Sequence, residues 1–293
     1  EYYVIFEIKH LKYCNMYIDN IPNEFKGQNV LYHYTEASTA LEYILADERL
    51  KLSPRKKSAD PIENSEINYI VCSSRKDFNT KNIDHEKIDK IITASKEKEE
   101  SLKQICFCVN KDEKKYEYYQ IRPHEYYGFL KPRMWDQYGD RYNGVCLAFN
   151  QTVLSDKNAD IDHASKVKYL RYIDLHPGIN VKIEEAFLGC WNTEDYVVNF
   201  KEYMNTNAFK KHRDYINEDE FRIIKYSKKD CYLSIKDCLL GIVISSNLSS
   251  YQTKTFYKYA IDYKVPIVRI LWDNSDLKFD IKKGSDLDSF ISI

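Results

Sequence analysis

The hydrophobic and polar positions of the chain change from one period to another within LYHYTEASTALEYIL, residues 31–45. LYHY alternates its faces as a β-strand does, and the apolar residues that follow recur at helical spacing. Either Thr35 or Ser38 is a candidate cap for that helix. The pattern predicts a strand followed directly by a helix, with His33 near the strand end. A polar ring at that place suits a functional site, and it equally suits a hydrogen-bonded core histidine.

Short apolar runs and longer amphipathic stretches predict the other elements. We expect strands at 105–110, 144–149, 167–173, 220–226, 231–235, 239–245 and 266–273, and helices at 82–104, 135–138, about 180–212 and 251–264. Helices inserted among many short strands, without a regular βαβ rhythm, favour an α+β fold. No Gly/Ser-rich or Pro-rich linker divides the chain of 293 residues. We therefore expect one α+β domain over residues 30–293, with residues 1–29 as an unassigned N-terminal extension.

Composition and charge restrict the location and the partners. The formal net charge of −1 and the isoelectric point near 6.7 argue against binding to nucleic acid by charge alone. The basic cluster at residues 210–213 is more often a solvated helix face than a binding site. The eight cysteines include no CxxC pair or zinc-like spacing, which is typical of a reducing compartment. No apolar run reaches the 18 residues of a membrane span, so we expect a cytoplasmic protein without a membrane partner.

The stretch EDEFR carries the most chemical information. On a strand, Glu218, Glu220 and Arg222 would share one face, and Arg222 would favour the ionised form of both carboxylates. An ionised glutamate can stabilise a cationic, oxocarbenium-like transition state. The alternative is a solvated strand face that cross-strand pairs stabilise.

Two more acids, Asp60 and Glu63, lie in a loop that contains proline. A helix cap is their ordinary explanation. If they met Glu218 and Glu220, four carboxylates could bind a divalent metal ion and cleave phosphodiesters. An E-x-K pattern is missing because Arg222 stands at the lysine position, so we give a metal-dependent nuclease a low rank.

Two aromatic residues, Trp135 and Tyr138, stand three positions apart on the predicted helix at 135–138. We expect Trp135 to pack in the core. Tyr138 can stack on a flat ring of a ligand while its hydroxyl stays hydrated.

Four stretches in a fixed order carry a resemblance: LYHYT at 31–35, DPIE at 60–63, MWDQYGDRYNGVCLAF at 134–149 and EDEFRI at 218–223. They resemble a bacterial family of unknown function whose members often accompany phage-defence or abortive-infection genes. The resemblance covers most of residues 30–285. The chain departs from the family pattern at Ala59, Ile62 and Gly139, where the family usually has Asn, an aromatic residue and Ala.

The first strand and helix are also similar to the first motif of the ADP-ribosyltransferase superfamily, in which a His-x-Thr strand binds NAD. This resemblance implies a split mixed or antiparallel sheet with inserted helices. It implies that His33 holds the adenosine-side ribose of NAD, with Thr35 in the same motif, and that Glu220 is catalytic with Glu218 and His33. Tyr34 or a later tyrosine such as Tyr138 would stack on nicotinamide, beside Arg222.

Together these resemblances predict an antiviral defence effector, a toxin that acts as an ADP-ribosyltransferase or NAD glycohydrolase. NAD would be its substrate, with no tightly bound cofactor and no metal ion. A protein or nucleic acid would accept ADP-ribose, and a phage protein or antitoxin is a further possible partner. The alternatives are a non-catalytic sensor or toxin-partner module and the metal-dependent nuclease.

Overall fold

The computed structural model describes residues 21–58, 60, 61, 63, 69–72, 85–111, 126–175, 179–182, 201, 203–273 and 276–282. The strands are β1 (Val30–Thr35), β2 (Arg49–Pro54), β3 (Tyr69–Cys72), β4 (Leu102–Val109), β5 (Val145–Asn150), β6 (His163–Lys166), β7 (Lys168–Leu170), β8 (Ile179–Lys182), β9 (Lys210–His212), β10 (Glu220–Tyr226), β11 (Cys231–Ser234), β12 (Leu239–Ser245), β13 (Ile267–Asp273) and β14 (Asp276–Lys282). The helical segments are η1 (Asn23–Phe25), α2 (Ala37–Thr39), the π-helical η2 (Ala40–Leu45), η3 (Arg55–Lys57), α3 (His85–Ser101), η6 (Gly128–Leu130), α5 (Pro132–Gln137), α6 (Gln151–Lys157), α7 (Tyr172–Leu175), η7 (Arg213–Glu218) and α10 (Ser250–Asp262).

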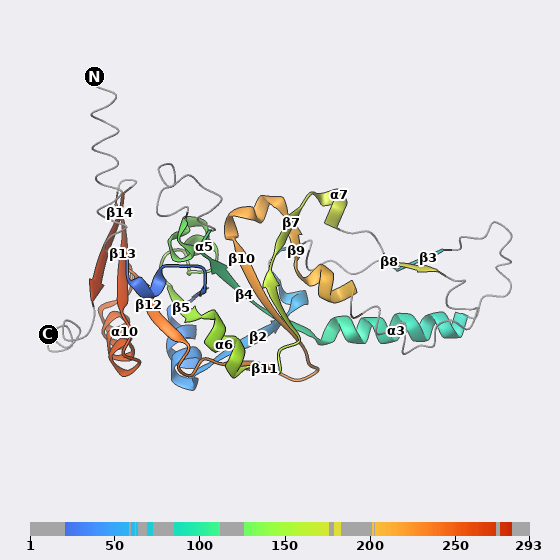
Figure 1. Ribbon diagram of the computed structural model, residues 1–293, viewed down its shortest axis with the longest axis horizontal. Helices are drawn as coiled ribbons and strands as arrows, with labels where there is room; N and C mark the ends of the chain where they lie inside the picture. Colours follow the sequence, from blue (N-terminus) through green and yellow to red (C-terminus); the bar gives the residue numbers. More distant parts are fainter. Residues whose placement is uncertain are drawn as a thin grey trace, which may run out of the picture.

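A mixed sheet of ten strands organises the described part of the chain, which confirms the predicted α+β class (Figure 1). The main path of the sheet runs β11-β2-β4-β1-β5-β12-β13-β14, and β10 pairs with β4 and β6. Most neighbours are antiparallel, but β12 and β13 are parallel. A parallel pair needs a crossover connection, and α10 supplies it. The side chain of Ser249 caps α10 in a capping box with Gln252, which fixes where this helix begins.

The sheet splits between β1 and β4. β1 pairs with β5 along its whole length, but it pairs with β4 only at Leu31 and Tyr32. On the same side of β4, β2 pairs only at Gln104 and Lys103. In the described part of the chain, residues 105–107 therefore have no strand partner on this side. The gap opens one edge of β4 beside His33, and it leaves space for a groove in the middle of the sheet.

Both faces of the central strands are covered. Leu31 of β1 belongs to one apolar cluster together with Ile44 of η2 and Phe256 of α10. Tyr34 points to the other face and belongs to a cluster that contains Trp135 of α5. β5 is buried on both sides, which explains why its sequence VCLAF is a continuous apolar run.

Ile21 and Phe25, from the segment that the sequence analysis assigned to an extension, pack into the same core. Phe25 is fully buried, and its ring meets those of Tyr32 and Phe129 edge-on at centroid distances of 6.1 and 5.2 Å. The hydroxyl of Tyr32 donates to the carbonyl of Phe25. This contact joins the beginning of the described chain to β1. Residues 1–20 lie outside the described residues.

Two predicted elements differ in the structure. The strand expected at 167–173 extends only over Lys168–Leu170, because Tyr172–Leu175 forms a helical turn. The helix expected at about 180–212 is interrupted by strands at both ends, β8 and β9, while residues 203–208 are helical. Residues 183–200 and 202 of that prediction lie outside the described residues.

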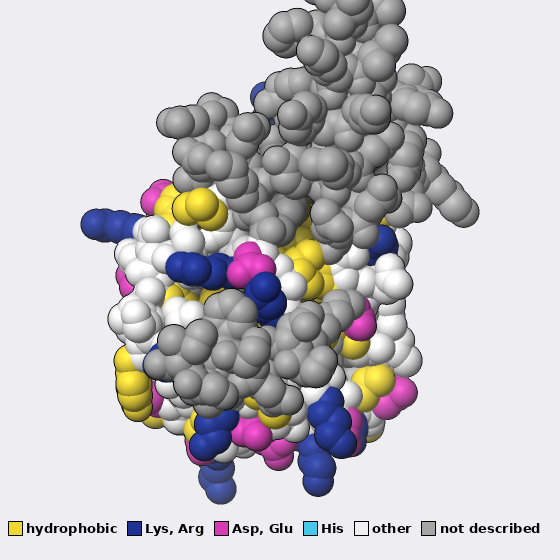
Figure 2. All heavy atoms as spheres, turned by 90° about the vertical axis from the view of Figure 1, so that its left-hand side faces the viewer, with side chains coloured by type: hydrophobic (Ala, Val, Ile, Leu, Met, Phe, Trp, Pro, Cys, Tyr) yellow, Lys and Arg dark blue, Asp and Glu magenta, His cyan; other side chains and the backbone are white. Residues whose placement is uncertain are grey.

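The described helices include none that is both long and apolar enough to cross a membrane. Figure 2 shows Lys and Arg side chains interspersed with Asp and Glu on the face it displays.

Candidate functional site

A groove of about 930 Å³ lies at the split of the sheet, and it brings together residues from all four sequence motifs. This volume is within the range of small-molecule sites, roughly 300–1,000 Å³. The sequence-predicted residues that line the groove are His33, Tyr34, Thr35, Tyr138, Glu218, Glu220 and Glu63. Arg222 lies behind the lining, in the buried polar network described below, and Asp60 is buried, with its backbone N–H donating to the Ser58 hydroxyl.

His33 is half-buried at the edge of the gap between β1 and β4. Its Nδ1 donates to the carbonyl oxygen of Cys106, at 3.2 Å. Because a carbonyl can only accept, this bond places the proton on Nδ1 and leaves Nε2 as an acceptor. Burial lowers the pKa of His33 below its usual 6.5, although the bond to Cys106 opposes that shift. His33 is therefore a neutral ring at pH 7, able to accept a hydrogen bond from a hydroxyl.

Tyr34 does not offer its ring to the groove. Its side chain lies on the opposite face of β1 from His33, with its hydroxyl donating to the carbonyl of Gly128 at 2.7 Å. The ring packs edge-on against Trp135, at a centroid distance of 5.3 Å. The predicted stacking role of Tyr34 does not fit this core position. Trp135 is fully buried, as the sequence analysis expected.

Thr35 and the turn after α5 fix the position of Tyr138. Tyr138 keeps 37% of its surface exposed at the end of α5, and it lines the groove. The three residues of the following turn, residues 140–142, all have left-handed backbone conformations. Gly144 closes the turn against β1: a Cβ there would stand 2.3 Å from the carbonyl oxygen of Thr35. Only glycine permits this approach, which holds Tyr138 next to the end of β1.

Glu218 and Glu220 are buried, with 2% and 4% of their surfaces exposed, so they are not part of a solvated strand face. Glu220 begins β10, as predicted. Glu218 instead ends the 3₁₀ helix η7, because Asp219 adopts a left-handed conformation with φ of 45°. The expected strand geometry at Glu218 is therefore wrong. The turn nevertheless directs both carboxylates to a common partner, Lys211.

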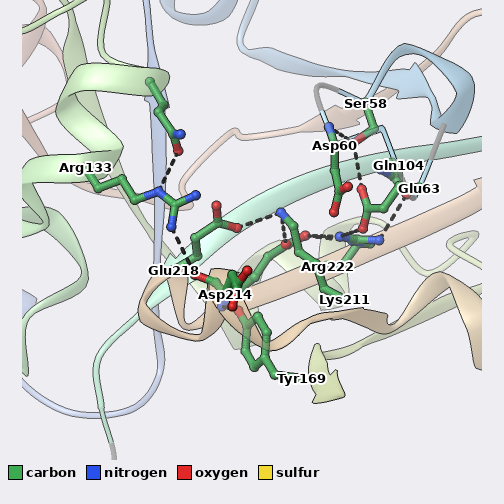
Figure 3. Close-up of polar contacts among 12 residues, drawn as sticks. Ser58, Asp60, Glu63, Gln104, Arg133, Tyr169, Lys211, Asp214, Glu218 and Arg222 are labelled. Carbon is green, nitrogen blue, oxygen red and sulfur yellow. Dashed lines mark hydrogen bonds and ion pairs between the residues drawn. The ribbon is translucent and has the colours of Figure 1, made fainter. Parts of the chain in front are cut away.

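Lys211 is the main residue that the sequence analysis missed. Its Nζ lies 2.6 Å from Glu218 Oε2 and 3.2 Å from Glu220 Oε2, and only 4% of its side chain is exposed (Figure 3). Burial would lower its pKa, but the two carboxylates raise it above the usual value. The cluster at residues 210–213 was interpreted as a solvated helix face. In the structure it is strand β9 followed by η7, and Lys211 points inward.

Arg222 binds the second pair of carboxylates and has no exposed surface. Its Nε donates to Glu220 Oε1 at 2.7 Å, and its Nη2 donates to Glu63 Oε1 at 2.6 Å. Its Nη1 donates to the carbonyl of Ala208. Burial alone would lower the pKa of Arg222, but Glu220 and Glu63 raise it. Arg222 thus joins β10 to the loop that carries DPIE, 159 positions earlier in the chain.

The same contacts argue against a metal site built from Asp60, Glu63, Glu218 and Glu220. Glu63 accepts from Arg222 and from the Ser58 hydroxyl at 2.7 Å. Burial would raise the pKa of Glu63, but the charges of Arg222 and Lys211 lower it below 4.5. Within the described ranges, no group of three or more His, Cys, Asp or Glu side chains is arranged to hold a metal ion. Glu63, Glu218 and Glu220 have protein cations as their counter-ions.

The wall that carries Glu218 is fastened to α5 by two basic residues. Lys131, only 5% exposed, binds the carboxylate of Asp219 and donates to the carbonyl of Asn217 at 2.9 Å. Arg133 donates to the carbonyl of Asp214 at 3.1 Å. Tyr138 and Glu218 therefore belong to one packed unit of the groove wall.

Glu218 has fewer compensating contacts than Glu220. Its Oε1 is buried without a hydrogen-bond partner among the described residues. Burial raises its pKa above the usual 4.5, although Lys211 opposes that shift. The Glu218 carboxyl therefore loses its proton at lower pH in the unfolded chain than in the folded protein. Its contribution to the free energy of unfolding is fully present below about pH 4.5 and falls as pH rises through the folded pKa.

This sign gives a test by urea unfolding at several pH values between 4 and 8. We expect the stability of the wild type relative to Glu218→Gln to fall as pH rises. Glu97→Gln is the control with the opposite sign, because hydrogen bonding to Lys228 lowers the pKa of Glu97. The advantage of the wild type over that variant should rise with pH. Parallel trends for the two variants would contradict the assignment for Glu218.

Comparison with known proteins finds similarity to one family over part of this groove. Residues 134–223 match the family described as "Protein of unknown function (DUF2971)". The matched segment includes MWDQYGDRYNGVCLAF and EDEFR, so it contains Tyr138, Lys211, Glu218, Glu220 and Arg222. The LYHYT and DPIE stretches lie before it. Comparisons with curated proteins and with solved structures gave no match.

Proposed function

We propose that the protein cleaves the bond between nicotinamide and ribose in NAD, either by transferring ADP-ribose to an acceptor or by hydrolysis. One observation carries the proposal: Glu218 and Glu220 line the same groove as the neutral ring of His33 and the half-exposed ring of Tyr138. The groove lies where the sheet splits, and motifs that are far apart in the sequence line it together.

The chemistry needs an ionised carboxylate beside the reacting ribose. Nicotinamide leaves from a cationic ring, so positive charge moves onto the ribose as the bond breaks. Glu220 has one oxygen bound by Arg222 at 2.7 Å and the other approached by Lys211 at 3.2 Å. A carboxylate offers about four lone-pair positions, so Glu220 can still accept from a ribose hydroxyl. The negative charge of that carboxylate then stabilises the oxocarbenium-like transition state.

The other groove residues supply binding and orientation. His33 accepts a hydrogen bond from the adenosine-side ribose through Nε2, the nitrogen not bound to Cys106. Tyr138 stacks on nicotinamide and replaces Tyr34 in that role, because the Tyr34 ring is held in the core. The predicted place of this activity in antiviral defence rests on the sequence resemblance alone.

The direct experiment measures nicotinamide release from NAD by the purified full chain, with and without EDTA. We expect release in both conditions, because protein cations rather than a metal ion hold the carboxylates. The same protein is incubated with single-stranded and double-stranded DNA and RNA. Intact NAD together with metal-dependent cleavage of nucleic acid would replace the proposal with the nuclease. Intact NAD and intact nucleic acid at high protein concentration would favour the sensor module.

A further inference from the structure

The groove extends beyond the carboxylates toward β2 and β11, and this outer half is lined by Tyr43, Arg49, Lys51, Lys57 and Tyr232. Four tyrosines in the described part of the chain are clearly exposed: Tyr43 at 60%, Tyr138 at 37%, Tyr232 at 37% and Tyr251 at 80%. All except Tyr251 line the groove. Aromatic side chains exposed along one groove can serve as stacking surfaces for flat rings.

Two of these basic residues, Arg49 and Lys51, belong to the exposed face of β2, and Lys57 lies in η3. Arg49 and Lys51 alternate with the buried Leu50, and the guanidinium of Arg49 lies 4.4 Å from the centroid of the Tyr232 ring. Their partners Asp47 and Asp230 lie at 2.8 and 2.7 Å, and all four side chains are at least 40% exposed. Exposed ion pairs of this kind contribute little to the free energy of unfolding. A phosphate can therefore replace either aspartate as the partner of Arg49 or Lys51 at little cost in free energy.

Two acids, Glu36 and Asp47, also line this part of the groove and reduce its positive charge. The outer half therefore suits a ligand that binds mainly by stacking and uses only a few phosphate contacts. NAD itself provides two rings, of which Tyr138 takes one. Three of the tyrosines that line the groove are exposed, so at least one stacking surface remains for another molecule.

We propose that the outer half of the groove binds single-stranded nucleic acid, with bases on Tyr43 and Tyr232 and phosphates at Arg49, Lys51 and Lys57. If the proposed function holds, the bound strand is also the acceptor of ADP-ribose, and this second role rests on that function. The C1′–N bond to nicotinamide breaks, a nitrogen or oxygen of the strand bonds to C1′, and the proton it loses goes to solvent. Binding of the strand does not require that reaction.

The test measures binding of a fluorescein-labelled ten-nucleotide strand of mixed sequence, as DNA and as RNA, by anisotropy without NAD. We expect Tyr43→Ser and Tyr232→Ser each to weaken binding by at least about 5-fold, the lower end of base–aromatic stacking. Tyr251→Ser is the matched control, since Tyr251 is exposed but lies outside the groove lining, and it should bind as the wild type does.

The salt dependence tests the phosphate contacts. Two or three contacts predict a slope of roughly −1.4 to −2.1 for the logarithm of the binding constant against that of salt concentration. Lys51→Gln should reduce the slope by about 0.7. Lys157→Gln, which removes a similar exposed pair with Asp237 at 2.8 Å, should leave it unchanged.

Three outcomes would overturn the inference: no binding of either strand, a loss of strand affinity in Tyr251→Ser equal to that in Tyr43→Ser and Tyr232→Ser, or complete displacement of the strand by NAD. The last outcome would assign the outer half of the groove to NAD itself. Nicotinamide release, measured separately, distinguishes this failure from failure of the proposed function. Strand binding without nicotinamide release would support the nucleic-acid site and contradict the proposed NAD-cleaving activity. Nicotinamide release without strand binding, with the ADP-ribose of labelled NAD found on protein or free in solution, would support the proposed function and contradict the nucleic-acid site.

Discussion

Replacing Glu220 with glutamine is expected to slow nicotinamide release by roughly 10²–10³-fold, about 2.7–4 kcal/mol in activation free energy, which is typical for loss of one key electrostatic contact. Glutamine keeps the shape of the side chain and an acceptor for Arg222, but it removes the negative charge from the transition state. The measurement is the steady-state rate at saturating NAD, alongside urea unfolding of the same preparation.

The unfolding curve is necessary because Glu220 also holds Arg222 and Lys211. Glu63→Gln is the matched control, since Glu63 is equally buried and loses an ion pair with the same Arg222. We expect both variants to unfold at lower urea concentration, and only Glu220→Gln to lose turnover well below its melting temperature. Equal loss of turnover in the two variants would show that the carboxylates act only through the structure of the network.

The second large effect concerns stability. Arg222→Met should lower the free energy of unfolding by about 3–5 kcal/mol, the usual result of removing one partner from a buried ion pair. The cost arises because Glu220 and Glu63 remain buried without the guanidinium. Arg49→Gln, which breaks an exposed pair with Asp47, should cost no more than about 1 kcal/mol.

A compensated variant makes the Arg222 test specific. Adding Glu63→Gln to Arg222→Met removes one of the two stranded charges, so part of the lost stability should return. If the double variant is less stable than the single one by the full cost of Glu63→Gln, the two residues do not interact, and the network is not the cause.

Local pattern predicted most of the elements that build the site. The alternation in LYHYT predicted β1, and the apolar run VCLAF predicted β5. The mixed sheet and its accompanying helices agree with the expected α+β class. No local pattern predicted β14, whose pairing with β13 is a tertiary property.

The charged centre was predictable only in part. Glu220 and Arg222 were placed correctly on one strand face, because side chains two apart on a strand share a face. Lys211 was missed because a run of basic residues resembles a solvated helix, and nothing local shows that it meets two glutamates. The sequence indicated the turn at Asp219 only weakly: Asn and Asp tolerate the left-handed backbone conformation, and this conformation redirects Glu218.

The 159-residue separation between Glu63 and Arg222 has a consequence for the order of synthesis on the ribosome. Contacts between positions so far apart are made late, because the intervening chain must first be ordered. Glu63 leaves the ribosome long before Arg222, and until then it lacks the guanidinium that holds it in the folded protein. A nascent chain therefore has no complete carboxylate centre before β10 has emerged and paired with β4. Translation itself keeps the groove unfinished until most of the chain has been made.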